Sequence, residues 1–190
     1  MVLPATAKTL LALGDSLTAG YGLAPGHAMP EVLQSALKKR GTDVTIINAG
    51  VSGDTAAQGA ARLDWALTPE VSGIILELGA NDALRGLPPE KTELALRQIL
   101  DKVKAKNVPV LILGMKAPPN LGADYQTQFD AIFPRLAADY HQPIYAFYLD
   151  GVAAQPDLNQ QDGIHPNDKG VALIVSQMLP LVEDFVKRLP

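Results

Sequence analysis

Five short runs of hydrophobic residues recur along the chain, and each run has the length of a β-strand. They occupy residues 10–13, 44–47, 73–78, 108–113 and 144–147. Nearly continuous apolar runs of this kind are typical of parallel strands that are covered on both faces. The pattern therefore predicts a five-stranded parallel sheet.

Helical periodicity fills the segments between these runs. It predicts helices at residues 30–39, 55–67, 89–106, 125–140 and 166–189, with a break near Pro180 in the last one. Strands that alternate with helices build βαβ units with right-handed crossovers. We therefore expect a three-layer α/β fold, organised as one domain over residues 1–190.

Composition narrows the chemistry that is available to this fold. The 190 residues include three histidines and no cysteine, which excludes disulfides, thiolate metal sites and a cysteine nucleophile. The net charge is −4 and the sequence has no basic tail that could neutralise phosphates, so we expect no nucleic-acid partner. No apolar run approaches the roughly 18 residues of a membrane span, so we expect no stable membrane insertion. A periplasmic or secreted location after loss of a signal peptide and a cytoplasmic one both stay open, as does the oligomeric state.

Polar and glycine-rich segments follow four of the five predicted strands. They lie at residues 14–17, 48–54, 79–82 and 162–166. The carboxyl ends of parallel strands meet at one edge of the sheet, which is where such folds bind ligands. We therefore expect these segments to form one site, bordered by the Pro/Gly-rich loop at residues 115–123.

The three histidines differ in their position relative to this edge. His141 directly precedes the fifth strand and so lies at the opposite end, whereas His27 is interpreted as a partly exposed residue ahead of a helix. His165 follows the fifth strand, with Asp162 three residues before it. This spacing allows the carboxylate to bind one ring nitrogen and leave the other free, as in a hydrolase triad. In the alternative interpretation, Asp162 stabilises its loop and the histidine is incidental.

Ser16 is the candidate nucleophile, because it follows the first strand and a glycine that permits a sharp turn. A serine in this position is also a common helix N-cap. The backbone N–H groups of Ser16 and Gly53 and the side-chain amide of Asn81 are candidate oxyanion donors, and they favour the catalytic role. In the alternative, Gly53 only makes a turn and Asn81 only caps a helix. The G-x-S-x-G elbow of α/β-hydrolases does not occur in the sequence.

Other residues receive structural interpretations. Glu77 lies inside the third strand, where a buried carboxylate needs a partner or a position near a strand edge, and a catalytic role is disfavoured. Asp15 and Asp54 lie next to glycines and are expected to hold loops. No cluster of His, Asp or Glu has metal-ligand spacing, so we expect neither a metal nor a cofactor. Four large side chains are interpreted as core or pocket wall: Met29, Trp65, Tyr125 and Phe147.

Four sequence blocks begin within these polar segments, in order GDSLTAG at residue 14, SGDT at 52, GAND at 79 and DGIHP at 162. In these blocks the whole chain resembles the SGNH/GDSL hydrolase superfamily. Residues 78–86, 98–100 and 162–167 are similar to its small bacterial thioesterase/lysophospholipase/arylesterase subgroup. The resemblance implies a flavodoxin-like fold with strand order 2-1-3-4-5. It also implies that Ser16 is the nucleophile, His165 the base and Asp162 its orienting partner, with Ser16, Gly53 and Asn81 forming the oxyanion hole.

We therefore expect a metal-free serine esterase that acts on small acyl esters of short to medium chain length. Thioesters, lysophospholipids and acetylated carbohydrates are alternatives that use the same chemistry. A flavodoxin-like binding module is the alternative outside enzymes. It is disfavoured because the first strand is followed by neither a phosphate-binding loop nor a cluster of acids.

Overall fold

A computed structural model describes residues 8–190 and shows five parallel strands in the order β2-β1-β3-β4-β5. The strands are β1 (Lys8–Gly14), β2 (Val44–Gly50), β3 (Gly73–Glu77), β4 (Val110–Leu113) and β5 (Ile144–Tyr145). This arrangement confirms the predicted parallel sheet and the strand order that the family resemblance implied. The fourth and fifth strands are each two residues shorter than predicted, because β4 begins at Val110 and β5 ends at Tyr145.

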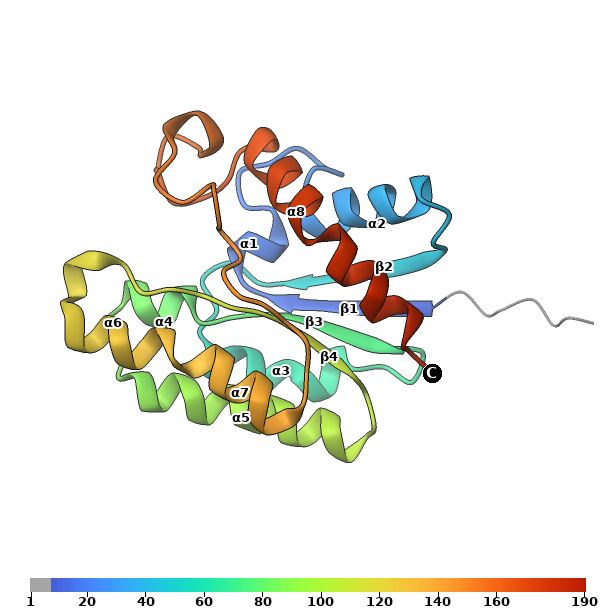
Figure 1. The fold of residues 1–190 in the computed structure, drawn as a ribbon, viewed down its shortest axis with the longest axis horizontal. Helices are drawn as coiled ribbons and strands as arrows, with labels where there is room; N and C mark the ends of the chain where they lie inside the picture. The colour runs from blue at the N-terminus through green and yellow to red at the C-terminus, as the bar shows by residue number, and fades with distance from the viewer. Residues whose placement is uncertain (1–7) are drawn as a thin grey trace, which may run out of the picture.

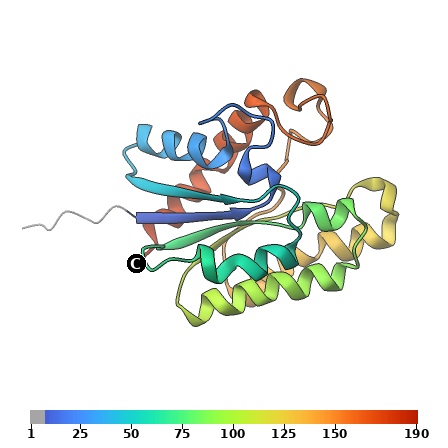
Figure 2. The same cartoon turned by 180° about the vertical axis from the view of Figure 1, so that it is seen from behind.

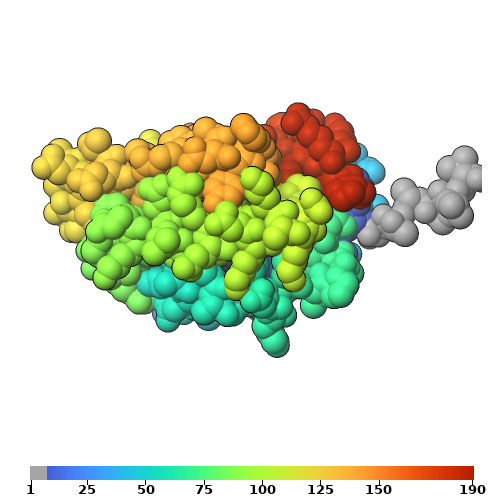
Figure 3. All heavy atoms as spheres, turned by 90° about the horizontal axis from the view of Figure 1, so that it is seen from below, coloured from blue at the N-terminus to red at the C-terminus, as the bar shows by residue number. Residues whose placement is uncertain are grey.

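Helices cover both faces of the sheet (Figures 1 and 2). One face carries α2 (Met29–Lys39) and α8 (Asp168–Lys187), which pack against each other. The other face carries α3 (Ala56–Ala66), α5 (Pro89–Ala105), α6 (Ala123–Asp130) and α7 (Ile132–Tyr140), and Figure 3 shows this layer closely packed. Strand β1, which lies between β2 and β3, is consequently inaccessible to solvent from Leu10 to Leu13, which is why its sequence is continuously apolar.

Two prolines affect their helices differently from what the periodicity predicts. The segment predicted as one helix at residues 125–140 is divided at Ala131, because Pro134 cannot donate to the carbonyl of Asp130 and its ring crowds that carbonyl. Pro180, in contrast, leaves α8 unbroken. It lies on the exposed side of that helix, where water can replace the missing hydrogen bond.

Two very short helices lie at the carboxyl end of the sheet, where periodicity has too few residues to detect them. Helix α1 (Ser16–Ala19) follows β1, and α4 (Ala80–Leu84) follows β3. Both begin within the polar segments of the sequence. The adjacent strands β1 and β3 therefore deliver two helix N-termini to the same edge of the sheet.

Candidate active site

Ser16 opens α1 with its side chain free of any capping role. The N-cap is Asp15, whose Oδ1 accepts a hydrogen bond of 3.0 Å from the backbone N–H of Leu17. The turn into α1 is tight, since a Cβ on Gly14 would overlap the hydroxyl of Thr18. The structure thus removes the simpler interpretation of Ser16 as a helix cap.

The loop before α8 brings His165 to this serine. The Nε2 atom of His165 lies 2.9 Å from the Oγ of Ser16, although 149 positions separate the two residues. The Nδ1 atom of the same ring lies 2.6 Å from the Oδ2 of Asp162. Ser16, His165 and Asp162 therefore form one continuous chain of polar contacts.

Asp162 is held by its own loop as well as by the imidazole. Its Oδ1 accepts the backbone N–H groups of Ile164 and His165, each at 3.0 Å. Partial burial raises the pKa of Asp162, but the hydrogen bonds from the backbone and ring of His165 outweigh this and lower it to about 2. The carboxylate is consequently ionised at neutral pH and fixes the orientation of the ring.

Tyr21, which the sequence interpretation missed, packs its ring against the imidazole of His165. Its ring centroid lies 4.7 Å from that of His165, with a tilt of 38° between the two planes. The tyrosine follows α1 by two residues and is 55% exposed, so nothing in the hydrophobic pattern indicates its position.

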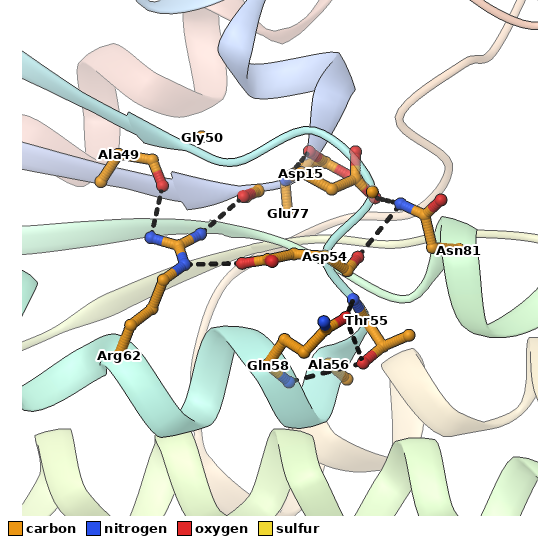
Figure 4. Close-up of polar contacts among 12 residues, drawn as sticks. Asp15, Ala49, Gly50, Asp54, Thr55, Ala56, Gln58, Arg62, Glu77 and Asn81 are labelled. Carbon is orange, nitrogen blue, oxygen red and sulfur yellow. Dashed lines mark hydrogen bonds and ion pairs between the residues drawn. The ribbon is translucent and has the colours of Figure 1, made fainter.

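The expected oxyanion donors gather beside Ser16 with one complication. Within residues 8–190, the backbone N–H groups of Ser16 and Gly53 have no hydrogen-bond acceptor, and Gly53 adopts a φ of +88° that favours glycine. Asn81 is at the same site, but its Nδ2 already lies 3.0 Å from Asp15 Oδ2 and 3.0 Å from the carbonyl oxygen of Asp54 (Figure 4). The amide is therefore not free in the way that the sequence interpretation expects.

Arg62 of α3 ties the loops around this site together (Figure 4). Its Nε lies 2.6 Å from Asp54 Oδ2, and its two terminal nitrogens donate at 2.8 Å to the carbonyls of Ala49 and Gly14. One guanidinium thus joins the ends of β1 and β2 to the loop that carries Gly53. The sequence interpretation missed Arg62. The one feature of the sequence that could have indicated its role is its position next to the buried residues of a helix whose inner face is otherwise apolar.

Three buried carboxyl groups support the same loops. Asp82 accepts the backbone N–H of Ala56 at 2.8 Å and the hydroxyl of Thr92 at 3.0 Å, and burial raises its pKa. Asp15 and Glu77 lie together beneath the turn that holds Ser16, and neither is accessible to solvent. Glu77 accepts hydrogen bonds from the Asp15 N–H and the Thr18 hydroxyl, which are partners of the kind that the sequence interpretation expected. Asp15 accepts the N–H of Leu17 and so holds its loop, as expected.

An open, mainly apolar cavity of about 630 Å³ extends from Ser16 and His165. The Pro/Gly-rich loop after β4 forms part of its wall, as expected. Of the four large side chains, Phe147 lines this cavity, and Met29 and Tyr125 belong to or pack against the core. Trp65 was misinterpreted: it is 85% exposed, because it lies on the face of α3 that points away from the sheet.

The remaining histidines lie outside this site, as predicted. His141 caps α7 at the opposite end of the sheet with a φ of +52°, and His27 contacts Asp168 in a loop. Over residues 8–190, no group of three or more His, Cys, Asp or Glu side chains has an arrangement that could hold a metal ion. In that same part of the chain, no helix is long and apolar enough to cross a membrane.

Comparisons with known proteins place the chain among hydrolases of one family. Residues 12–173 match the GDSL-like lipase/acylhydrolase family. The chain is 40% identical over 183 residues to the thioesterase 1/protease 1/lysophospholipase L1 of Escherichia coli (strain K12), covering 96% of this chain and 86% of that protein. It is 38% identical over 178 residues to an arylesterase of Vibrio mimicus, covering 90% and 88%. The crystal structure of AlinE4, an SGNH-hydrolase family esterase, superposes with a TM-score of 0.81 at 44% identity, covering 95% and 97%.

Proposed function

Because this chain belongs to the GDSL-like lipase/acylhydrolase family, we propose that it is a serine esterase that uses Ser16, His165 and Asp162 to hydrolyse carboxylic esters. The observation that carries the proposal is the pair of contacts on the His165 ring, 2.9 Å to Ser16 and 2.6 Å to Asp162. A general base needs hydrogen-bond reach to the proton that it removes, and a partner that fixes its tautomer. Both conditions are met here.

In the first half of the reaction, Ser16 Oγ attacks the acyl carbon of the ester while its proton passes to His165 Nε2. The carbon–oxygen π bond opens, and its electron pair moves to the carbonyl oxygen. Collapse of this tetrahedral intermediate breaks the bond to the alcohol, which leaves with the proton from Nε2. An acyl group then remains on Ser16.

In the second half, a water molecule attacks the acyl carbon and gives a proton to Nε2. The second intermediate collapses, the carboxylic acid departs, and Ser16 Oγ recovers its proton from the imidazolium. Asp162 stays ionised throughout and stabilises the positive charge that His165 carries after each proton transfer.

The negative oxygen of each intermediate would lie among the donors beside Ser16. The backbone N–H groups of Ser16 and Gly53 have no competing acceptor within the described residues, which suits them to this role. Asn81 would supply the third donor by turning the hydrogen that faces the Asp54 carbonyl partly toward the oxyanion. One such donor is typically worth a factor of about 100 to 1,000 in kcat.

The cavity favours an acyl chain over a polar substrate. Side chains such as Met115, Phe147 and Leu149 give it an apolar wall. We therefore propose acyl esters of short to medium chain length as first substrates. Thioesters and lysophospholipids are the second candidate, since the Escherichia coli relative is named for both.

Covalent labelling tests the nucleophile. A p-nitrophenyl alkylphosphonate should release one equivalent of p-nitrophenol, abolish esterase activity, and add its mass to the peptide that contains Ser16. The Ser16→Ala variant should be neither labelled nor active. Labelling at another serine, or full activity in Ser16→Ala, would contradict the proposal.

A substrate series distinguishes the substrate classes. We expect kcat/KM for p-nitrophenyl esters to rise from acetate toward medium chains, because each added methylene buried in the cavity stabilises binding by about 0.8 kcal/mol. The same chain lengths presented as thioesters measure the second candidate. A preference for acetate over all longer chains would argue against an acyl-binding role for the cavity.

A further inference from the structure

Two carboxyl groups lie side by side beneath the proposed nucleophile. Asp15 follows the last residue of β1, and Glu77 is the last residue of the neighbouring β3, paired in register with Gly14. Both side chains are completely inaccessible to solvent. Two negative charges at this depth would destabilise the fold strongly, so the pair must hold a proton.

The contacts of the two groups are unequal. Asp15 receives a donor on each oxygen, the N–H of Leu17 on Oδ1 and the amide of Asn81 on Oδ2, both at 3.0 Å. Glu77 receives both of its donors on Oε2, from the Asp15 N–H at 3.2 Å and the Thr18 hydroxyl at 2.8 Å. Its Oε1 has no partner among the described residues. Both oxygens of Asp15 thus accept donors, as suits an anion, whereas Oε1 of Glu77 is free to carry a proton. Figure 4 shows the Asn81 amide directed at Asp15.

The surrounding charges agree with this distribution. Burial raises the pKa of Asp15 to about 6, although the Leu17 and Asn81 hydrogen bonds and the charge of His165 lower it. Burial and the charge of Asp15 raise the pKa of Glu77 much further. The other titratable group facing the pair is Tyr148, whose pKa burial also raises. Arg62 lies nearby, but its charge is directed to Asp54.

We propose that Glu77 keeps the single proton of the pair and Asp15 the negative charge, and that Asp15 is the positioning residue for the amide of Asn81. The Asp15 carboxylate takes one hydrogen of that amide and so fixes its direction. The second hydrogen, on the Asp54 carbonyl, is then the one that an oxyanion can share. The positioning part of this inference rests on the proposed function, whereas the location of the proton does not.

Two isosteric substitutions separate the roles of the two acids. Glu77→Gln keeps the group neutral and can still accept from Asp15 and Thr18, so kcat should stay within about twofold of wild type. Asp15→Asn turns a donor toward the Asn81 amide and displaces it, so kcat should fall by about 100-fold with little change in KM. A similar loss in both variants, or wild-type kcat in Asp15→Asn, would overturn the proposal.

A double-mutant cycle tests whether Asp15 acts through Asn81. In the Asn81→Ala background, Asp15→Asn should lower kcat by no more than about twofold, because the group that it positions is already gone. If the two losses multiply instead, Asp15 contributes independently of Asn81 and its assignment as a positioning residue is wrong. Circular dichroism of each variant checks that the fold is retained.

The pH dependence of stability tests the proton on Glu77 without any activity measurement. An unfolded glutamate loses its proton above its ordinary pKa of 4.5, whereas native Glu77 retains it. The native state then binds more protons, so the stability of the wild type falls as pH rises through this range. Relative to Glu77→Gln, the unfolding equilibrium constant of the wild type should rise by about tenfold per pH unit between pH 5 and 8.

A pH-independent difference between these two proteins would show that Glu77 is ionised when folded and would overturn this part of the proposal. Glu183→Gln is the matched control, because Glu183 is also buried but pairs with Arg40, at 2.6 Å and far from the site. It should not reproduce the pH dependence of Glu77→Gln. A wild type without esterase activity would contradict the proposed function, while the unfolding series would still decide where the proton lies.

Discussion

Two His–Asp pairs lie at the same end of the described chain, and in one of them the histidine also contacts a serine hydroxyl. His27 Nδ1 lies 3.0 Å from Asp168, and His165 Nδ1 lies 2.6 Å from Asp162. The His27 and Asp168 side chains are 51% and 64% exposed, against 16% and 35% for His165 and Asp162. Within residues 8–190, the second ring nitrogen of His27 has no hydrogen-bond partner, whereas that of His165 faces Ser16.

The difference shows which structural features distinguish the pair of the proposed triad from an ordinary His–Asp pair. In an exposed pair, water competes for the hydrogen bond between the two side chains and screens their electrostatic attraction. The His165 pair is fixed by two backbone N–H groups on Asp162 and by the ring of Tyr21. A contact between a histidine and an aspartate is therefore not sufficient by itself. The His165 pair differs because its loop fixes the carboxylate and because the second ring nitrogen faces the hydroxyl of Ser16.

Removal of each imidazole should give the largest contrast. His165→Ala should lower kcat/KM for p-nitrophenyl butyrate by about 10⁵- to 10⁶-fold, because His165 is the one side chain among residues 8–190 that contacts Ser16 Oγ and can accept its proton. His27→Ala should stay close to wild type in the same initial-rate assay. A substantial loss in His27→Ala would mean that the two pairs are not as different as the structure indicates.

Removal of each aspartate should give a smaller contrast. Asp162→Ala should cost about 10³- to 10⁴-fold in kcat, less than the loss of His165, because an imidazole without its partner can still act as a base even when it is poorly oriented. Asp168→Ala serves as the control and should leave kcat unchanged. Equal losses for Asp162→Ala and His165→Ala would point to a role for Asp162 beyond orientation.

The proposed oxyanion donors lie beside Ser16, on the His165 side of this comparison. Asn81→Ala should lower kcat by about 100- to 1,000-fold and change KM little, because the lost interaction strengthens only when charge develops on the carbonyl oxygen. Steady-state kinetics over a range of ester concentrations separates the two constants. A change confined to KM would assign Asn81 to substrate binding instead.

The pH profile should show the smallest effect and should report on Asp15 and on the His165 pair. The pKa of Asp15 is raised to about 6, so activity should fall as this carboxylate takes up a proton and its hold on the Asn81 amide weakens. The reaction needs the neutral ring of His165, since only that form can accept the Ser16 proton. The pKa of Asp162 is lowered to about 2, so this carboxylate stays ionised and should add no step above pH 4. The profile of His27→Ala should coincide with that of wild type, and a shifted acidic limb would contradict this.

Much of the fold follows from local patterns in the sequence. Strand β1 is continuously apolar because both of its faces are covered, and that pattern is visible without coordinates. The contact between Asp162 and His165 spans three residues and is equally local. The division of the helix at Ala131 was not predicted, although Pro134 supplies its physical cause.

Other features depend on which segments meet in three dimensions. The sequence places Glu77 in a strand, but only the sheet register shows that its neighbour is the turn beneath Ser16. Asn81 is visible as a polar residue after a strand, but the direction of its amide depends on Asp15 and Asp54. Trp65 is exposed because it lies on the side of α3 that points away from the sheet.

The sequence by itself determined the order of the elements, the edge where the polar residues gather and the one histidine with the right neighbours. These follow from hydrophobic periodicity and from the rule that parallel strands end at the same side of the sheet. The tertiary structure alone decided that His165 meets Ser16 across 149 positions and that two acids share a buried site. Distances and burial of this kind arise from the packing of remote segments, and no short stretch of sequence encodes them.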